Sequence, residues 1–261
     1  PKKRTVLALS GGGSFGAYTA GVLCGWTEAG DRPQFDVVTG VSTGALIAPL
    51  AFLGPKYDPE LKRLYTTVHD CDIFRLRDPV SALTSDSVAD TGPMAEGIAQ
   101  IVTPEFLAAV AAEHEKGRRL YAGTTALDAG RPVVWDLGAI ACRGTPEALT
   151  LFREVLRASA AVPGLFPPVR LPVEVDGKTL EERHIDGGVT AAVFFRPPHV
   201  PAEMKGHPDY SCLYGSDLYV IVAGKLYPDP DRVRDKALTI AGHGVTTLIS
   251  AQTRGDLIKL Y

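Results

Sequence analysis

Within its first fifty residues the chain twice passes from a short apolar run, through a glycine-rich turn, into a helix-like segment. The first unit has a predicted strand at Thr5–Leu9 and a predicted helix at residues 17–29. The second has a predicted strand at residues 35–39 and a helix at residues 45–48. Parallel strands need a crossover connection, which is usually a helix. Two such units in succession therefore predict an α/β protein with a parallel sheet.

The rest of the chain is consistent with one domain over residues 1–261, since it shows no repeat, low-complexity tract or linker. Residues 55–100 have no clean period and predict short helices and loops. Thr103 is a predicted N-cap for a helix at 104–118. Further predictions are strands at 120–126, 133–136 and 218–223, a helix at 145–158, a proline loop at 163–168, a hairpin of 169–175 and 180–185, and a helical region at 232–260 interrupted at 242–244.

Composition narrows the classes of partner. The formal net charge of −3 gives no basic footprint for nucleic acid. No stretch approaches the roughly 18 apolar residues that a membrane-spanning helix needs, so a soluble domain is expected. The chain starts without Met, and both a cytoplasmic and an exported location stay open. Buried thiols are expected for the four scattered cysteines, with disulfides open if the protein is exported; these are Cys24, Cys71, Cys142 and Cys212.

Gly40, Ser42 and Gly44 form a G-x-S-x-G pattern between the second predicted strand and its helix. A nucleophilic serine at such a position lies on a tight, strained turn, which requires small neighbours. The free N–H groups of the helix N-terminus favour negative charge there. The pattern and its context predict Ser42 as a nucleophile. The alternative is a glycine-rich turn in which Ser42 caps the helix.

The first glycine-rich turn, Gly-Gly-Gly-Ser-Phe-Gly, begins at Gly11 and has two candidate uses, both of which depend on exposed backbone N–H groups. One is an oxyanion hole for an attacked carbonyl. The other is dinucleotide binding, because Gly11, Gly13 and Gly16 satisfy G-x-G-x-x-G. That use needs an acidic residue at the end of the second strand, whereas Asp36 lies at its start. The oxyanion hole is therefore favoured.

A third motif, Asp186-Gly187-Gly188, follows a predicted strand. A carboxylate followed by two glycines can approach another backbone closely. In isolation this motif is more typical of a simple turn than of a catalytic site. Nearby His184 is expected to be a structural or supporting residue.

Together, the three motifs resemble those of the patatin-like phospholipases, in the same order. The segment at 159–168 is similar to the loop that precedes the family's aspartate, so the resemblance spans roughly residues 6–188. It implies a three-layer α/β/α sandwich with a mostly parallel sheet, related to the α/β hydrolases. It also implies a lipid acyl hydrolase that uses a catalytic dyad of Ser42 and Asp186, with no metal and no organic cofactor.

In that scheme Ser42 attacks the ester carbonyl of a lipid or fatty-acyl ester, Asp186 accepts the serine proton, and water releases the acid from an acyl-enzyme. A carboxylate can serve as this base only if partial desolvation raises its pKa. The resemblance assigns Gly11, Gly12, Gly13 and Thr43 to the oxyanion hole, and Gly16, Gly40, Gly44, Gly187 and Gly188 to support of the motifs.

Phe15 departs from the family pattern, because many members have Arg or Lys at this position. Loss of a cation there weakens the expectation of phospholipid head-group preference and favours neutral lipids, lysophospholipids or simple esters. Head group, acyl-chain length, positional preference, activator and oligomeric state stay open.

Two other functions stay open. A Ser–His–Asp hydrolase would use a histidine after Asp186, namely His199, His207 or His243, although Ser42 lies early for that fold. A non-catalytic lipid- or nucleotide-binding module would use the glycines alone. Peripheral membrane contact is expected at residues 49–54 and 164–166 only if these apolar segments are exposed; core packing is the alternative.

Overall fold

The fold is taken from a computed structural model, which describes residues 3–175, 177–195, 216–227, 230, 232–233 and 235–260. Its main sheet has the strand order β7-β8-β5-β2-β1-β9, and β6 pairs with β5 beside this path. The four strands β9, β1, β2 and β5 are parallel, and β6, β7 and β8 join in antiparallel pairs. The strands are β1 (Thr5–Leu9), β2 (Val37–Val41), β5 (Arg119–Ala126), β6 (Arg131–Asp136), β7 (Val169–Val175), β8 (Lys178–Asp186) and β9 (Asp217–Ile221), with β3 (Arg75–Leu76) and β4 (Ala89–Asp90) in a separate pair.

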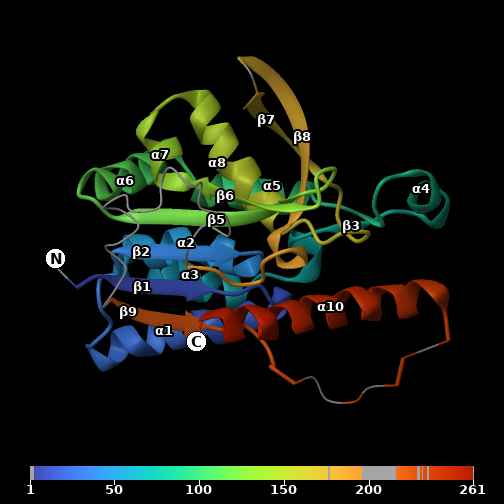
Figure 1. Cartoon of the computed structure of the whole chain (residues 1–261), viewed down its shortest axis with the longest axis horizontal. Coiled ribbons are helices and arrows are strands. Elements are labelled where there is room, and N and C mark those ends of the chain that lie inside the picture. The colour runs from blue at the N-terminus through green and yellow to red at the C-terminus, as the bar shows by residue number, and fades with distance from the viewer. Residues whose placement is uncertain are drawn as a thin grey trace.

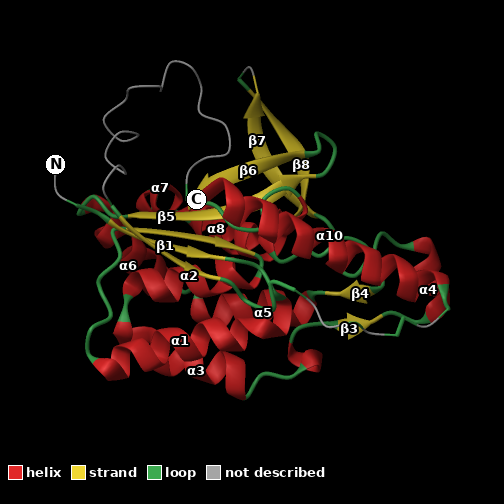
Figure 2. Ribbon diagram, turned by 60° about the horizontal axis from the view of Figure 1, so that its bottom comes forward, coloured by secondary structure: helices red, strands yellow, loops and turns green. Residues whose placement is uncertain are grey.

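Helices cover both faces of the sheet. In Figure 1, α10 lies below the strands, from near β9 to past their right-hand ends, while α2 lies behind β2. The turned view in Figure 2 places α10 on the face opposite α1, α2 and α3, and shows the β7–β8 hairpin rising from the end of the sheet. In the described residues the helices of four or more residues are α1 (Gly16–Ala29), α2 (Thr43–Leu53), α3 (Asp58–Thr66), α4 (Pro79–Thr84), α5 (Gly92–Ile101), α6 (Pro104–Glu115), α7 (Leu137–Cys142), α8 (Pro146–Ser159) and α10 (Ala237–Leu260).

The predicted α/β class, with a mostly parallel central sheet flanked by helices, is confirmed. β1 has the predicted bounds, and α1 ends where Gly30 adopts the left-handed conformation. Val37–Val41 is buried throughout, as expected of a parallel strand covered on both faces. This strand starts and ends two residues later than predicted. The difference arises because Gly40 continues the pairing with β1 instead of ending the strand.

The helix after Ser42 is longer than the predicted 45–48 and continues through Pro49 to Leu53. A proline inside a helix removes one backbone hydrogen bond. Here the helix is buried along most of its length, and this packing offsets the loss. The apolar residues at 49–52 are therefore core residues, which ends the proposal that they touch a membrane. In the second candidate segment Phe166 is buried, while Leu165 is 37% exposed.

The predicted interruption at 242–244 is wrong, because α10 runs unbroken from Ala237 to Leu260. Glycine ends a helix when it adopts a positive φ, as Gly30 does, and neither Gly242 nor Gly244 has a positive φ. Among the described helices none is both long and apolar enough to cross a membrane by itself. One bent pair, α5 with α6, meets the length and composition criteria together, at an angle of 63°.

The expectation of buried thiols is corrected at two positions. Cys24 is half-buried, whereas Cys71 and Cys142 are exposed, and all three are free thiols. Cys71 lies in the short 3-10 helix Asp70–Asp72, and Cys142 is the last residue of α7, where its thiol lies 3.8 Å from the Ala111 carbonyl. Cys212 lies outside the described residues.

Candidate active site

The candidate site forms where two strands meet end to end along one edge of β5. β2 runs parallel to β5 and places Val41 opposite Gly123. β8 runs antiparallel and places Asp186 opposite Thr124, the next residue of β5. β6 occupies the other edge of β5 at both positions, so β2 and β8 share one edge and approach each other head-on. This register brings the residue after Val41 to the carboxylate of Asp186, 144 positions later in the chain.

Ser42 lies in a strained turn between β2 and α2. Its backbone has φ 55° and ψ −128°, and it is the sole non-glycine residue with a positive φ in the described part of the chain. Such a conformation costs on the order of 1–3 kcal/mol and persists only where the surroundings enforce it. Gly44 contributes to that enforcement: a Cβ there would lie 2.6 Å from the carbonyl oxygens of Leu9 and Ser10.

Ser42 Oγ donates a hydrogen bond to Asp186 Oδ2 at 2.5 Å, and both residues are buried. A second anchor holds the serine backbone, since Ser42 N–H donates to Ser159 Oγ at 2.9 Å. The Ser159 hydroxyl in turn donates to the Gly123 carbonyl at 2.6 Å. The nucleophile candidate is thus fixed through its side chain by Asp186, and through its backbone by the last residue of α8.

Burial raises the pKa of Asp186 to about 6, even though hydrogen bonds from Ser42 and Gly188 act in the opposite direction. The Gly188 N–H bond to Oδ1 is 2.7 Å long and leaves Oδ2 for the serine. The aspartate backbone is also held, because its N–H donates to the Ala161 carbonyl at 2.8 Å. Gly187 packs so closely on β5 that a Cβ there would overlap the Gly123 carbonyl. The carboxylate is therefore desolvated, is held in a fixed orientation, and is more basic than an ordinary aspartate.

The first glycine-rich turn lies directly over the serine. A Cβ at Gly11 would be 2.9 Å from Ser42 Cβ and 3.6 Å from its Oγ. Gly11 N–H is already engaged by the Ala192 carbonyl at 3.4 Å. Among the described residues no acceptor faces the N–H groups of Gly12, Gly13 or Thr43. These three predicted oxyanion donors are available, whereas Gly11 serves to position the turn.

Tyr65 of α3 joins the two turns, and no sequence motif marked it. Its hydroxyl lies 2.5 Å from Thr43 Oγ1, and burial raises its pKa to about 12, so it is neutral near pH 7. The tyrosine ring and the Thr43 hydroxyl both lie against Gly16, where a Cβ would overlap them. This packing accounts for the glycine at the start of α1. A spacing pattern could not reveal Tyr65, because α3 is joined to the site through tertiary contacts alone.

His184 belongs to a separate buried network. Trp135 Nε1, which can only donate, bonds to Thr124 Oγ1 at 2.9 Å, and that hydroxyl lies 2.9 Å from His184 Nδ1. The other ring nitrogen, Nε2, lies 3.1 Å from Glu182 Oε2. Burial lowers the pKa of His184, against the raising effect of Glu182. In the described residues its contacts are with Thr124, Glu182 and Trp135, and the supporting role expected from the sequence stays a prediction.

The other histidines do not join the serine in the described structure. His243 lies on α10 with an exposed side chain, while His199 and His207 lie outside the described residues. Within the described ranges, the hydrogen-bond partner of Ser42 Oγ is Asp186. In the same part of the chain, no three His, Cys, Asp or Glu side chains gather as a metal site requires.

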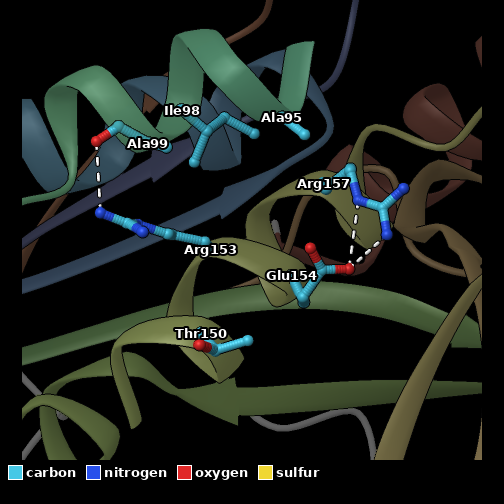
Figure 3. Close-up of a pocket in the computed structure, with 7 residues that line it drawn as sticks. All are labelled: Ala95, Ile98, Ala99, Thr150, Arg153, Glu154 and Arg157. Atoms are coloured by element: carbon cyan, nitrogen blue, oxygen red, sulfur yellow. Dashed lines mark hydrogen bonds and ion pairs between the residues drawn. The ribbon is translucent and has the colours of Figure 1, made fainter. Parts of the chain in front are cut away.

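A cavity of about 200 Å³ between α5 and α8 is a separate feature. In Figure 3, Arg153 reaches from α8 to the carbonyl of Ala99, and Arg157 pairs with Glu154 on the same helix. The guanidinium groups are thus engaged by backbone and carboxylate oxygens. Neither Ser42 nor Asp186 lines this cavity, which the following residues enclose: Ala95, Ile98, Ala99, Thr150, Arg153, Glu154 and Arg157.

Several known proteins with similar sequences are named as patatin-like phospholipases. Patatin-like phospholipase domain-containing proteins of Chaetomium globosum and Cryptococcus neoformans var. neoformans are 40% identical over 78 residues and 30% identical over 190 residues. These matches cover 30% and 70% of this chain, and 9% and 20% of the relatives. A cUMP-AMP-activated phospholipase of Escherichia coli is 48% identical over 64 residues, or 23% of this chain and 20% of its own length. The chain spans a fifth or less of the length of these relatives.

The crystal structure of VipD from Legionella pneumophila aligns with 95% of this chain and 53% of its own, at 13% identity and a TM-score of 0.48. A family model for patatin-like phospholipase matches residues 7–199. This match covers more than half of the chain. It includes the glycine-rich turn over the serine, the strained turn itself and the segment that follows β8. The chain therefore belongs to the patatin-like phospholipase family.

Proposed function

We propose that this chain is a serine lipid acyl hydrolase in which Ser42 is the nucleophile and Asp186 the base. The observation that carries the proposal is the 2.5 Å hydrogen bond from Ser42 Oγ to a buried carboxylate whose pKa is raised to about 6. At pH 7–8 that carboxylate is ionised and can accept a proton. Its raised pKa also makes it a stronger base than an ordinary aspartate.

In the proposed reaction, Ser42 Oγ attacks the ester carbonyl while its proton moves to Asp186 Oδ2. The carbonyl oxygen gains negative charge, which the free N–H groups of Gly12, Gly13 and Thr43 stabilise together with the N-terminus of α2. The tetrahedral intermediate collapses, the alcohol leaves with the proton from Asp186, and the acyl group stays on Ser42. Water then attacks this acyl-enzyme and gives a proton to Asp186; the bond between Ser42 Oγ and the acyl carbon breaks, Oγ takes the proton back from Asp186, and the fatty acid is released.

The substrate class follows from the family and from Phe15. The Phe15 side chain lies on the first glycine-rich turn, is 58% exposed and carries no charge. We propose that the enzyme cleaves neutral lipids, lysophospholipids or simple fatty-acyl esters at least as well as diacyl phospholipids. Hydrolysis of a monoacylglycerol, a lysophospholipid and a diacyl phospholipid with the same acyl chain tests this: a preference of about tenfold or more for the diacyl phospholipid over both others contradicts it.

The catalytic proposal is tested with p-nitrophenyl esters of increasing chain length on the wild type, Ser42→Ala, Asp186→Asn and His184→Ala. We expect the first two variants to lose activity by about 10⁴-fold or more, as removal of a nucleophile or its base does. His184→Ala should retain activity per folded molecule, because its contacts are with Thr124, Glu182 and Trp135. Equal loss in His184→Ala would revive a histidine-dependent mechanism.

A serine-directed fluorophosphonate separates catalysis from simple lipid binding. The enzyme should be labelled at Ser42, and Asp186→Asn should be labelled far more slowly. If the folded wild type neither hydrolyses esters, in solution or on vesicles, nor reacts with the phosphonate, the chain is a binding module and the proposal is wrong.

A further inference from the structure

Helix α10 begins well beyond residue 199, where the family match ends, yet it lies against the segment that follows Asp186. Figure 2 shows it on the face of the sheet opposite α1, α2 and α3. Most residues in its first half are exposed, whereas Thr253 and Asp256 are buried polar residues in its second half. A buried carboxylate is costly unless it accepts hydrogen bonds. The partners of Asp256 therefore indicate what this helix does.

Asp256 and Gln252 hold two backbone groups of the segment at 190–192. Asp256 Oδ2 accepts a 2.8 Å hydrogen bond from Ala192 N–H. Gln252 Nε2 donates to the Thr190 carbonyl at 3.1 Å and to Asp256 Oδ1 at 2.8 Å. The exposed Lys259 contacts the same Oδ1 at 3.0 Å but does not contact the segment.

The segment at 190–192 is itself bonded to both halves of the candidate site. The Ala192 carbonyl accepts the N–H of Gly11, on the turn that carries the free oxyanion donors. On the other side, the Thr190 hydroxyl bonds to Thr125 Oγ1 at 2.7 Å, and Thr125 donates to the Asp186 carbonyl at 3.0 Å. Ala192 is therefore bonded directly to the first glycine-rich turn, called the oxyanion turn below. Thr190 is connected to Asp186 through one intervening residue, Thr125.

We propose that Asp256 and Gln252 are positioning residues of the hydrolase, which set the oxyanion turn and Asp186 relative to Ser42 by holding residues 190–192. The inference rests on the proposed function for its effect on rate, but the contacts do not depend on it. A displacement of about 1 Å in such groups can lower the rate by about 100-fold. Neither residue touches the substrate, so substrate binding should change little.

The test compares Asp256→Ala, Asp256→Asn, Gln252→Ala and the double alanine variant with Lys259→Ala, which removes a contact of the same carboxylate but leaves the segment held. We expect Asp256→Ala to lower kcat on a p-nitrophenyl ester by about 10–100-fold, the range for removal of supporting contacts. KM should stay within about threefold, because uniform binding is unaffected. Lys259→Ala should match the wild type.

Two further results are expected if the positioning role is correct. Asp256→Asn should recover part of kcat, since its amide oxygen still accepts from Ala192 but cannot also accept from Gln252 without placing two donors together. The double variant should be little worse than Asp256→Ala, because both side chains act through one segment. Circular dichroism melting corrects each value for the folded fraction. If Asp256→Ala does not fold, Asp256→Asn and Gln252→Ala carry the comparison.

Hydrogen exchange gives a measurement that needs no activity. Peptides containing residues 10–16 and 186–195 should exchange faster in Asp256→Ala than in Lys259→Ala. Unchanged exchange, or a kcat per folded molecule equal to that of the wild type, overturns the inference. If exchange rises as expected but the wild type hydrolyses no ester and reacts with no phosphonate, the proposed function fails while the positioning contacts stand.

Discussion

The two catalytic candidates are held in place in different ways. Ser42 lies in a turn that β2 and α2 build from adjacent residues, with a positive φ and a crowded glycine two residues on. Asp186 has an ordinary backbone conformation, with φ −47° and ψ 130°, and depends on contacts from β5, from Ala161, which lies two residues past the end of α8, and from Gly188.

The two side chains are therefore positioned by two different physical effects. A strained turn stores free energy locally, so the serine is positioned by the shape of its own backbone. The aspartate is positioned by hydrogen bonds from residues far away in the sequence. The elements that supply these bonds also bury its carboxylate, and this burial raises its pKa. We expect changes within the serine turn to act mainly through sterics, and changes around the aspartate to act through hydrogen bonding and pH.

The largest effect on the serine turn is expected from Gly44→Ala. The new Cβ would lie 2.6 Å from two backbone carbonyl oxygens, so β1 and α2 must separate. We expect a loss of at least about 3 kcal/mol in the free energy of unfolding, measured by urea denaturation. The matched control is Gly21→Ala on the exposed side of α1, where nothing lies within 4 Å of the added methyl group; it should stabilise by up to about 1 kcal/mol. Similar values for the two variants would contradict the crowding.

The aspartate should show a pH-dependent effect of nearly the same size. Its pKa is raised from 3.8 to about 6 on folding, so its contribution to stability is complete below pH 4 and is lost as the pH rises through 6. Asp186→Asn has no such titration. We expect the variant to become more stable than the wild type by up to about 3 kcal/mol at pH 8, relative to their difference at pH 3.5. Urea unfolding at both pH values measures this, and a pH-independent difference would show that the pKa is ordinary.

A smaller effect is expected where the two regions meet, at Ser159. Ser159→Ala removes the acceptor for Ser42 N–H and the donor to Gly123, so two buried backbone groups each lose one hydrogen bond. The free energy of unfolding should fall by about 2 kcal/mol, and kcat should fall with it. Thr150→Ala, on the exposed side of the same helix, should change stability by less than about 0.5 kcal/mol. A null result at Ser159 would mean that the turn holds itself.

The smallest effect concerns backbone strain alone. Ser42→Ala and Ser42→Gly both lack the hydroxyl, but glycine adopts a positive φ without steric cost. We expect Ser42→Gly to be more stable than Ser42→Ala by about 1 kcal/mol in thermal or urea unfolding. If alanine is equally stable, the turn relaxes in the variant and the strain is not enforced by its surroundings.

Much of the local structure could be predicted from the sequence. The strand at Thr5–Leu9, the helix that follows it, the Thr103 cap and the hairpin of β7 and β8 follow from short-range rules of periodicity, capping and backbone conformation. The same rules gave wrong bounds for two helices. Burial of α2 allows it to continue through its proline, and the glycines in α10 keep negative φ values, so in both helices the tertiary context overrides residue preference.

The α/β class and the order of the three motifs can be predicted from the amino-acid sequence, because each motif is a short run of adjacent residues, and the candidate pair of Ser42 and Asp186 is implied by the resemblance to the family. Which N–H groups are free, the engagement of Gly11, and the contacts of Ser159, Tyr65 and Asp256 around the site become visible in the three-dimensional packing alone. These contacts join elements up to 181 residues apart, as between Gly11 and Ala192. Pairing of backbone groups over such separations depends on strand register and helix packing, which no local pattern specifies.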